Sequence, residues 1–128
     1  MGSYDLQCTD LDAVTYTKAV QSDITIKAVT HDASLGDIGS YLTNNSYIYL
    51  NITNLSNGTN GVIYLRSVVT APASLSITSR NTSGTIVSTK LMDGAISMTA
   101  NKVTAIYYTY AENGSLYKEL FLTYKQSP

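Results

Sequence analysis

The chain is poor in charge and in the residues that usually build catalytic or disulfide-bonded sites. Charged residues make up 13 % of its 128 positions, and it contains one cysteine, one histidine and no tryptophan. The single Cys8 cannot form a disulfide within the chain, so stability does not depend on an oxidising compartment. The net charge is -1, with lysines and arginines scattered singly, so no basic stripe exists to neutralise phosphates. We therefore expect no nucleic-acid binding and no binding to anionic membranes.

Long apolar runs are also missing. No stretch approaches the roughly 20 apolar residues of a membrane-spanning helix. The first residues, 1–6, contain neither a basic segment nor an apolar segment. The sequence therefore predicts neither a membrane span nor a signal peptide.

Hydroxyl, amide and phenol side chains take the place of charge. The chain has 11 tyrosines, is rich in serine, threonine and asparagine, and is 44 % hydrophobic overall. That apolar content is sufficient for a packed core in a domain of this length. An uncharged polar surface can be buried against another protein at a modest desolvation cost. The composition thus favours a folded domain that contacts other proteins.

Apolar and polar residues alternate along most of the chain, which is the pattern of β-strands. In 46–55, Ile48, Leu50 and Ile52 form one apolar face. In 62–71, both the odd and the even positions are apolar, as in a strand that is covered on both faces. Asn-Gly and Asp-Gly pairs, which tolerate positive φ in tight turns, separate several of the runs. The other strand candidates are 3–9, 13–20, 24–28, 74–79, 85–92, 95–100 and the two strands of a final hairpin.

The spacing of these runs predicts the fold class. About eight or nine short strands with turns every 8–12 residues are typical of an all-β sandwich or barrel. Two glycines limit any helix to a short one near 33–42. We expect residues 1–128 to form a single-domain antiparallel β-sandwich, jelly-roll or immunoglobulin-like, with residues 1–12 as an extended N-terminal arm.

The final hairpin has the most informative pattern. If Asn113-Gly114 is a two-residue turn, Tyr107 pairs with Leu120 on the face expected to be the core. Cross-strand aromatic pairs on the other face would stabilise the hairpin by roughly 0.2–1 kcal/mol each. The competing interpretation is a contact with another chain, because tyrosine is enriched at interfaces. That second face is too aromatic for one left wholly in water, since it carries Ile106, Tyr108, Tyr110, Tyr117 and Phe121.

No arrangement of residues indicates catalysis or metal binding. His31 is the only histidine, no nucleophile motif accompanies it, and we expect it on the surface or in a solvated turn. Zinc needs more ligands than one cysteine and one histidine supply. Asp5, Asp10 and Asp12 fall short of a regular calcium loop, and we expect Glu119 to face solvent. The sequence predicts a non-enzymatic protein without catalytic residues, cofactor or metal.

The tyrosines also allow a carbohydrate-binding interpretation. Aromatic rings stack on sugar faces, and Tyr47, Tyr49 and Tyr64 lie near Asn-Gly turns. Ordinary cross-strand packing of the same three side chains is the simpler explanation. A glycan-binding module would take its specificity from the loops at 43–46, 56–61 and 80–84.

In composition and strand layout the whole chain resembles small bacteriophage virion proteins: capsid decoration (cement) proteins, head fibres, and neck or tail adaptors. The resemblance rests on the low charge, the abundance of Ser, Thr, Asn and Tyr, the all-β pattern, and the lack of structural cysteines and of a signal peptide. It implies a virion accessory protein, most simply a capsid decoration protein, that is made in the host cytoplasm and located in the virion. The implied partners are other virion proteins, such as the major capsid protein, and further copies of this chain in a homo-oligomer.

Two surfaces are the expected contacts with those partners. One is the Tyr-rich face of the final hairpin, and the other is the N-terminal arm, where strand 3–9 would add to a neighbouring sheet. The alternative function is a receptor- or carbohydrate-binding module of a tail, fibre or adhesin. The expected partner-binding residues are Tyr4, Leu6, Tyr107, Tyr108, Tyr110, Tyr117 and Phe121.

Overall fold

The computed structural model describes residues 18–20, 27–67 and 74–128. This part of the chain contains strands and turns but no helix, which confirms the all-β prediction. No helix in these ranges is long and apolar enough to cross a membrane. The described strands are β1 (Lys18–Val20), β2 (Ala28–Asp32), β3 (Ile38–Thr43), β4 (Tyr47–Leu55), β5 (Asn60–Ser67), β6 (Ser74–Asn81), β7 (Ile86–Leu91), β8 (Val103–Asn113) and β9 (Tyr117–Gln126).

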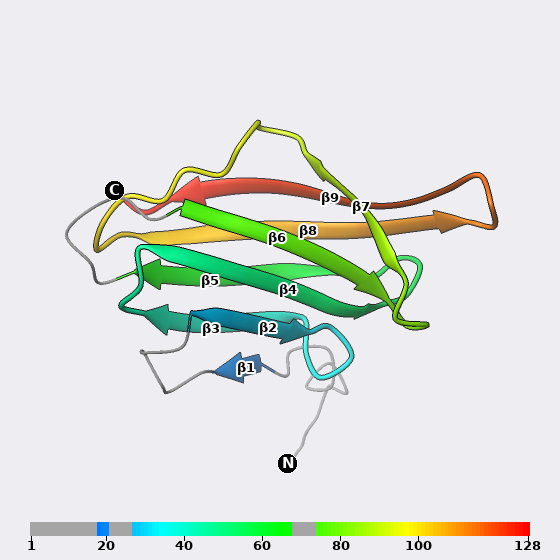
Figure 1. The fold of residues 1–128 in the computed structure, drawn as a ribbon, viewed down its shortest axis with the longest axis horizontal. Helices are drawn as coiled ribbons and strands as arrows, with labels where there is room; N and C mark the ends of the chain where they lie inside the picture. Colours follow the sequence, from blue (N-terminus) through cyan, green and yellow to red (C-terminus); the bar gives the residue numbers. More distant parts are fainter. Residues whose placement is uncertain (1–17, 21–26, 68–73) are drawn as a thin grey trace, which may run out of the picture.

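The first six strands alternate between two rows, so that the chain winds as a coil. Strands β7, β8 and β9 then connect the two rows (Figure 1). Strands β1, β3 and β5 pair side by side in one row, and β2, β4 and β6 pair in another. Strand β7 follows β6, and β9 and β8 connect β7 back to β5. The result is one sheet in the order β1-β3-β5-β8-β9-β7-β6-β4-β2, which curls into a nearly closed, barrel-like form.

Most of the strand pairing is parallel, so the prediction of an antiparallel sheet is wrong. Five of the eight pairings between described strands are parallel, namely β1–β3, β2–β4, β3–β5, β4–β6 and β7–β9. Only the pairings that involve β6–β7, β5–β8 and β8–β9 are antiparallel. Jelly-roll and immunoglobulin-like sandwiches are built from antiparallel sheets. The alternating pattern located strands correctly, but it holds no information on which strands pair.

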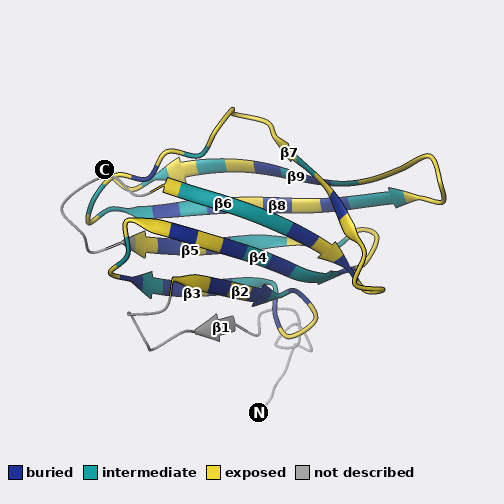
Figure 2. Ribbon diagram, in the orientation of Figure 1, coloured by how far each residue is buried: buried dark blue, intermediate teal, exposed yellow. Residues whose placement is uncertain are grey.

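The core lies inside the curled sheet and is built from alternate residues (Figure 2). On β4, Ile48, Leu50 and Ile52 are fully buried, as the period of two predicts. Leu55 is also fully buried although it lies three residues beyond Ile52. The strand register shifts between these two residues, where Asn54 adopts a φ of 57°. This bulge absorbs the extra residue and returns Leu55 to the core face.

Two local predictions fail. The segment expected to hold a short helix contains a turn after Asp32 and then β3. The amide of Leu35 donates to the Asp32 carbonyl in that turn, and the glycines that weakened the helix signal suit a turn and an extended strand. The segment 95–100 is irregular rather than a strand. Strand candidates 3–9, 13–17 and 24–26, and the proposed arm 1–12, lie outside the described residues.

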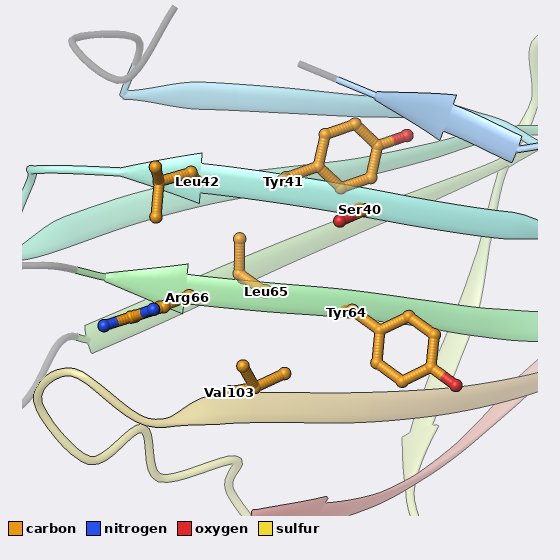
Figure 3. Close-up of a pocket in the computed structure, with 7 residues that line it drawn as sticks. All are labelled: Ser40, Tyr41, Leu42, Tyr64, Leu65, Arg66 and Val103. Carbon is orange, nitrogen blue, oxygen red and sulfur yellow. The ribbon is translucent and has the colours of Figure 1, made fainter. Parts of the chain in front are cut away.

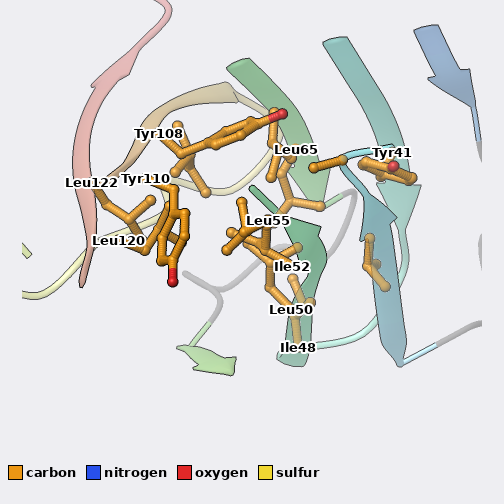
Figure 4. Packing of buried hydrophobic residues seen from close by; sticks show 14 of the residues in the cluster. Tyr41, Ile48, Leu50, Ile52, Leu55, Leu65, Tyr108, Tyr110, Leu120 and Leu122 are labelled. Atoms are coloured by element: carbon orange, nitrogen blue, oxygen red, sulfur yellow. The ribbon is translucent and has the colours of Figure 1, made fainter. Parts of the chain in front are cut away.

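The final hairpin has a different register from the predicted one, which exchanges the faces of β8. Asn113 pairs with Tyr117 around the turn Gly114–Leu116, so the turn has three residues rather than two. Tyr110 then pairs with Leu120, and Tyr108 pairs with Leu122. All four of these side chains point inward and are buried (Figure 4). A shift by an odd number of positions moves every side chain to the opposite face. The even-numbered residues of β8 therefore face the core.

One of those inward residues is a threonine whose hydroxyl is not satisfied. Thr104 is fully buried, and its Oγ1 has no hydrogen-bond partner among the described residues. We predict that Thr104→Val raises the free energy of unfolding by about 1 kcal/mol, because valine has nearly the same shape and removes an unpaired buried polar group. Urea denaturation measures the change. Thr109→Val, at an exposed position of the same strand, is the control and should stay within about 0.5 kcal/mol of wild type; equal shifts in both variants would contradict the explanation.

Candidate functional site

The outward face of β3, β5, β8 and β9 is unusually apolar for a surface. Antiparallel sheets that face water on one side normally carry polar residues there. Here many outward positions of four adjacent strands carry aliphatic and aromatic side chains, which are exposed or half-buried, although Ser40, Arg66 and Lys125 lie among them. We call this set the outer patch; it consists of Ile38, Leu42, Val62, Tyr64, Val103, Ala105, Tyr107 and Phe121.

Strand register brings these side chains together. Val62 lies directly between Ile38 and Tyr107, and Tyr64 lies beside Ala105. Residues opposite one another in a sheet share a face, with Cβ atoms roughly 4.5–5.5 Å apart. Tyr64 is 38 % exposed and Tyr107 is 43 % exposed. The two rings are thus available for contact with another molecule.

The patch contains a shallow hollow (Figure 3). It measures about 290 Å³ and lies over β3, β5 and the start of β8. Leu42, Tyr64 and Val103 line it, together with Ser40 and the exposed Arg66. A hollow lined by apolar side chains with one cation suits an apolar side chain of a partner better than it suits a charged ligand.

Few charged side chains lie on this face: the exposed Arg66 lies between Leu42 and Val103, and one ion pair lies at an edge of the patch. Lys90 and Glu119 form an ion pair of 3.7 Å at its β7–β9 side. Both side chains are partly exposed, so the pair contributes little to stability. Glu119, which is expected to face solvent, has a side chain that is 30 % exposed and has a cation beside it. The ion pair thus lies at one edge, whereas Arg66 is a single positive charge within the patch.

The structure places the sequence-predicted contact residues in different environments. Tyr107 and Phe121 belong to the outer patch, and Tyr117 is exposed near the tip of the same hairpin. The prediction is wrong for Tyr108 and Tyr110, which are 1 % and 0 % exposed and belong to the core. Tyr4 and Leu6 lie outside the described residues.

Sequence reasoning missed the part of the outer patch that β3 and β5 supply. Ile38 and Leu42 lie in the segment predicted to contain a short helix, and a helical pattern does not indicate which face of a strand they occupy. The segment 62–71 did carry a signal, because it is apolar at both parities. In the structure the odd positions Ile63 and Leu65 fill the core, while Val62 and Tyr64 face outward.

The three tyrosines proposed as a sugar platform do not form one surface. Tyr47 and Tyr49 project outward from β4, with ring centroids 4.9 Å apart and rings nearly perpendicular. Tyr64 projects outward from β5, which lies in the other row of strands. Perpendicular rings present one face and one edge rather than a continuous flat platform.

The only histidine is buried, which overturns the expectation of a solvated one. His31 is 0 % exposed and points inward from β2. Its Nδ1 lies 2.8 Å from the hydroxyl of Tyr41 on β3, and its Nε2 lies 3.1 Å from the hydroxyl of Tyr108 on β8. The Tyr108 hydroxyl also donates to the Asp37 carbonyl at 3.4 Å. Every partner is satisfied when neutral His31 donates from Nε2 and accepts the Tyr41 proton at Nδ1.

Two glycines make room for this cluster. A Cβ at Gly39 would lie 2.5 Å from the Tyr41 ring and 2.6 Å from His31 Nδ1. A Cβ at Gly61 would lie 2.0 Å from the Asp37 carbonyl oxygen and 2.7 Å from the Tyr108 hydroxyl. Both glycines are therefore required by close approach of other atoms rather than by backbone conformation.

Burial keeps the cluster neutral. Removal from solvent lowers the pKa of His31, and the nearby Gly36 backbone and the carboxylates of Asp32 and Asp37 offset only part of that effect. Burial likewise raises the pKa of Tyr41 to about 12 and raises that of Tyr108 further. A neutral imidazole with both nitrogens occupied, and closed to solvent, is a structural group rather than an accessible general base.

The part of the chain that the structure describes contains no group of three histidine, cysteine, aspartate or glutamate residues placed to hold a metal ion. Asp32, beside His31, is occupied in a local turn. Its carboxylate accepts hydrogen bonds from the Ser34 amide and hydroxyl and from the Asn54 side chain. Burial raises the pKa of Asp32, but these bonds, together with His31, outweigh that effect and hold the pKa below its usual value. The bonds give this carboxylate a structural role.

Comparison with known proteins adds no relative. No protein family matches the chain, and neither a curated protein nor a solved structure matches it. The case for function therefore rests on the surfaces described above.

The buried histidine predicts a stability that falls in mild acid. Its pKa is 6.5 in the unfolded chain and lower in the folded one, so the unfolded state takes up a proton that the folded state excludes. Stability is thus full above about pH 7, falls as the pH drops below 6.5, and stops falling at the folded pKa. Urea denaturation at several pH values measures it. His31→Gln should be less stable at neutral pH and lose the part of this slope that lies just below pH 6.5; an unchanged slope would refute the assignment.

Proposed function

We propose that this chain is a non-enzymatic structural protein of a virus particle, a bacteriophage capsid decoration or cement protein or a related virion accessory protein. It acts through protein–protein contacts, with the major capsid protein and with further copies of itself as partners. The observation that carries the proposal is the outer patch, a broad and largely apolar face with two half-exposed tyrosines.

The chemistry of the patch favours a protein partner. Interface centres are depleted in charge and enriched in aromatic side chains, with polar residues around them. Tyr64, Tyr107 and Phe121 supply the aromatic groups, and the Lys90–Glu119 pair lies at the margin. Contiguous apolar patches on soluble proteins commonly mark such contacts.

The rest of the surface is compatible with crowded packing in a particle. A net charge of -1 and a 13 % charged fraction leave little long-range repulsion between neighbouring copies. Serine, threonine and asparagine side chains can be buried against a neighbour at a lower desolvation cost than charged ones. The buried His31 also supports a non-enzymatic role, since the one histidine of the chain serves the core.

A polar hollow favours a second candidate, the carbohydrate-binding module. It measures about 570 Å³ and lies where the turn after β2 meets the loop before β5. Asp37, Thr59 and Asn60 supply a carboxylate, a hydroxyl and an amide to it, and such groups hydrogen-bond to sugars. A glycan array distinguishes the two candidates: reproducible binding that Asn60→Ala abolishes would favour this one.

Replacement of the two exposed tyrosines tests the main proposal. Tyr64→Ser together with Tyr107→Ser should lower binding of the recombinant chain to purified virus particles by at least about tenfold, since removal of buried interface aromatics costs about 1–2 kcal/mol or more. Binding is measured by co-sedimentation. The fold should be retained, because both side chains lie outside the core.

The matched control is Tyr47→Ser with Tyr49→Ser, which removes two equally exposed tyrosines from β4. It should bind particles as the wild type does. Light scattering and mass spectrometry of purified particles complete the test. A chain that is monomeric and absent from particles, or equal losses in both double variants, would refute the assignment.

A further inference from the structure

A groove opens between β6 and β7, because the two strands separate after a short contact. They pair only at Ser79 with Val87 and at Arg80 with Ile86. From there β7 turns away to pair with β9, as Figure 1 shows. The first five residues of β6, 74–78, have β4 as their only partner among the described strands.

On the side that faces this groove, the backbone of the first half of β6 is not paired with any described strand. The Ser74 amide donates to Ser46, which places it on the β4 side. The Asn81 amide donates to Thr85, which places it on the β7 side. Backbone groups alternate in direction along a strand, so the amides and carbonyls of Leu75 and Ile77 point toward β7. Neither residue forms a ladder pair there in the described part of the chain.

The groove is apolar and large enough for side chains. Its volume is about 280 Å³, and an apolar cavity of about 150 Å³ already accommodates a benzene-sized group. Leu91, one of its lining residues, is exposed. The described residues that line it are all uncharged, namely Leu75, Ile77, Thr89, Leu91, Ala95 and Ile96.

Charges near the groove are already engaged. Arg80 donates to the Gly84 carbonyl, Lys90 pairs with Glu119, and the Asp93 carboxylate accepts from the Tyr124 amide. An occupant is therefore selected by backbone hydrogen bonds and apolar side chains rather than by charge. The complementary ligand is an uncharged extended chain.

We propose that the groove between β6 and β7 binds an extended, uncharged segment of a partner protein, which adds as a strand along Ser74–Thr78. Its alternate apolar side chains fill the groove, and its backbone pairs with Leu75 and Ile77. This inference rests on the proposed function in one respect, since it takes the partner to be another protein of the same assembly. It adds a second kind of contact, at a strand edge, to the one at the outer patch.

Amide hydrogen exchange of the isolated chain tests the inference without any particle. The probe is a capped seven-residue peptide of alternating threonine and valine. In the free protein the amides of Leu75 and Ile77 should exchange faster than that of Leu50 in the centre of β4. At about ten times its Kd the peptide should slow both amides by about tenfold. The same peptide N-methylated at alternate amides, which cannot pair, should leave them unchanged.

Groove filling provides the matched variants. Ala95→Trp places a large ring at the groove and should abolish protection by the peptide, whereas Ala28→Trp, on the exposed face of β2, should not. Amides of Leu75 and Ile77 that are already slow in the free chain would overturn the inference, because the edge would then be occupied. So would the absence of protection at about 1 mM peptide, the weak end of specific binding. Neither result bears on the tyrosine variants of the outer patch, so the two proposals fail independently.

Discussion

The hydrogen-bonded cluster of His31, Tyr41 and Tyr108 holds together the part of the sheet that backbone pairing leaves open. β2 is the last strand of the sheet order, so only β4 flanks it among the described strands. His31 reaches from β2 to Tyr41 on β3 and to Tyr108 on β8, and thus joins both rows of strands across the interior. Such a cluster is stabilising only while every polar group in it has a partner. That requirement explains the two glycines beside it and its sensitivity to protonation.

The burial of Tyr108 in this cluster also determines which residues remain for the surface. Because β8 turns its even positions inward, Tyr108 and Tyr110 fill the core and Tyr107 faces out. The outward positions of β3 and β5 then extend the apolar surface beyond the hairpin. The proposed interface patch and the core thus lie on the same strands, at alternate positions.

The two proposed contact surfaces of the curled sheet have different physical origins. The outer patch offers side chains on a face where all four strands are paired, so its contacts are apolar and aromatic. The groove between β6 and β7 offers backbone groups, because two neighbouring strands diverge there. The first depends on amino-acid composition, whereas the second depends on strand geometry and is invisible in composition.

The sequence by itself determined the all-β class, the positions of most described strands and the low charge of the surface, because alternation and composition are local properties. It also placed Phe121 on the outward face of the final hairpin, but it assigned Tyr107, which is exposed, to the core face. It did not determine the mostly parallel strand pairing, the burial of His31 or the inward direction of Tyr108 and Tyr110. A period of two states which residues share a face, but the choice of the buried face belongs to register and pairing. The three-residue turn after Asn113 and the contacts between β2, β3 and β8 made that choice, and they exist only in the tertiary structure.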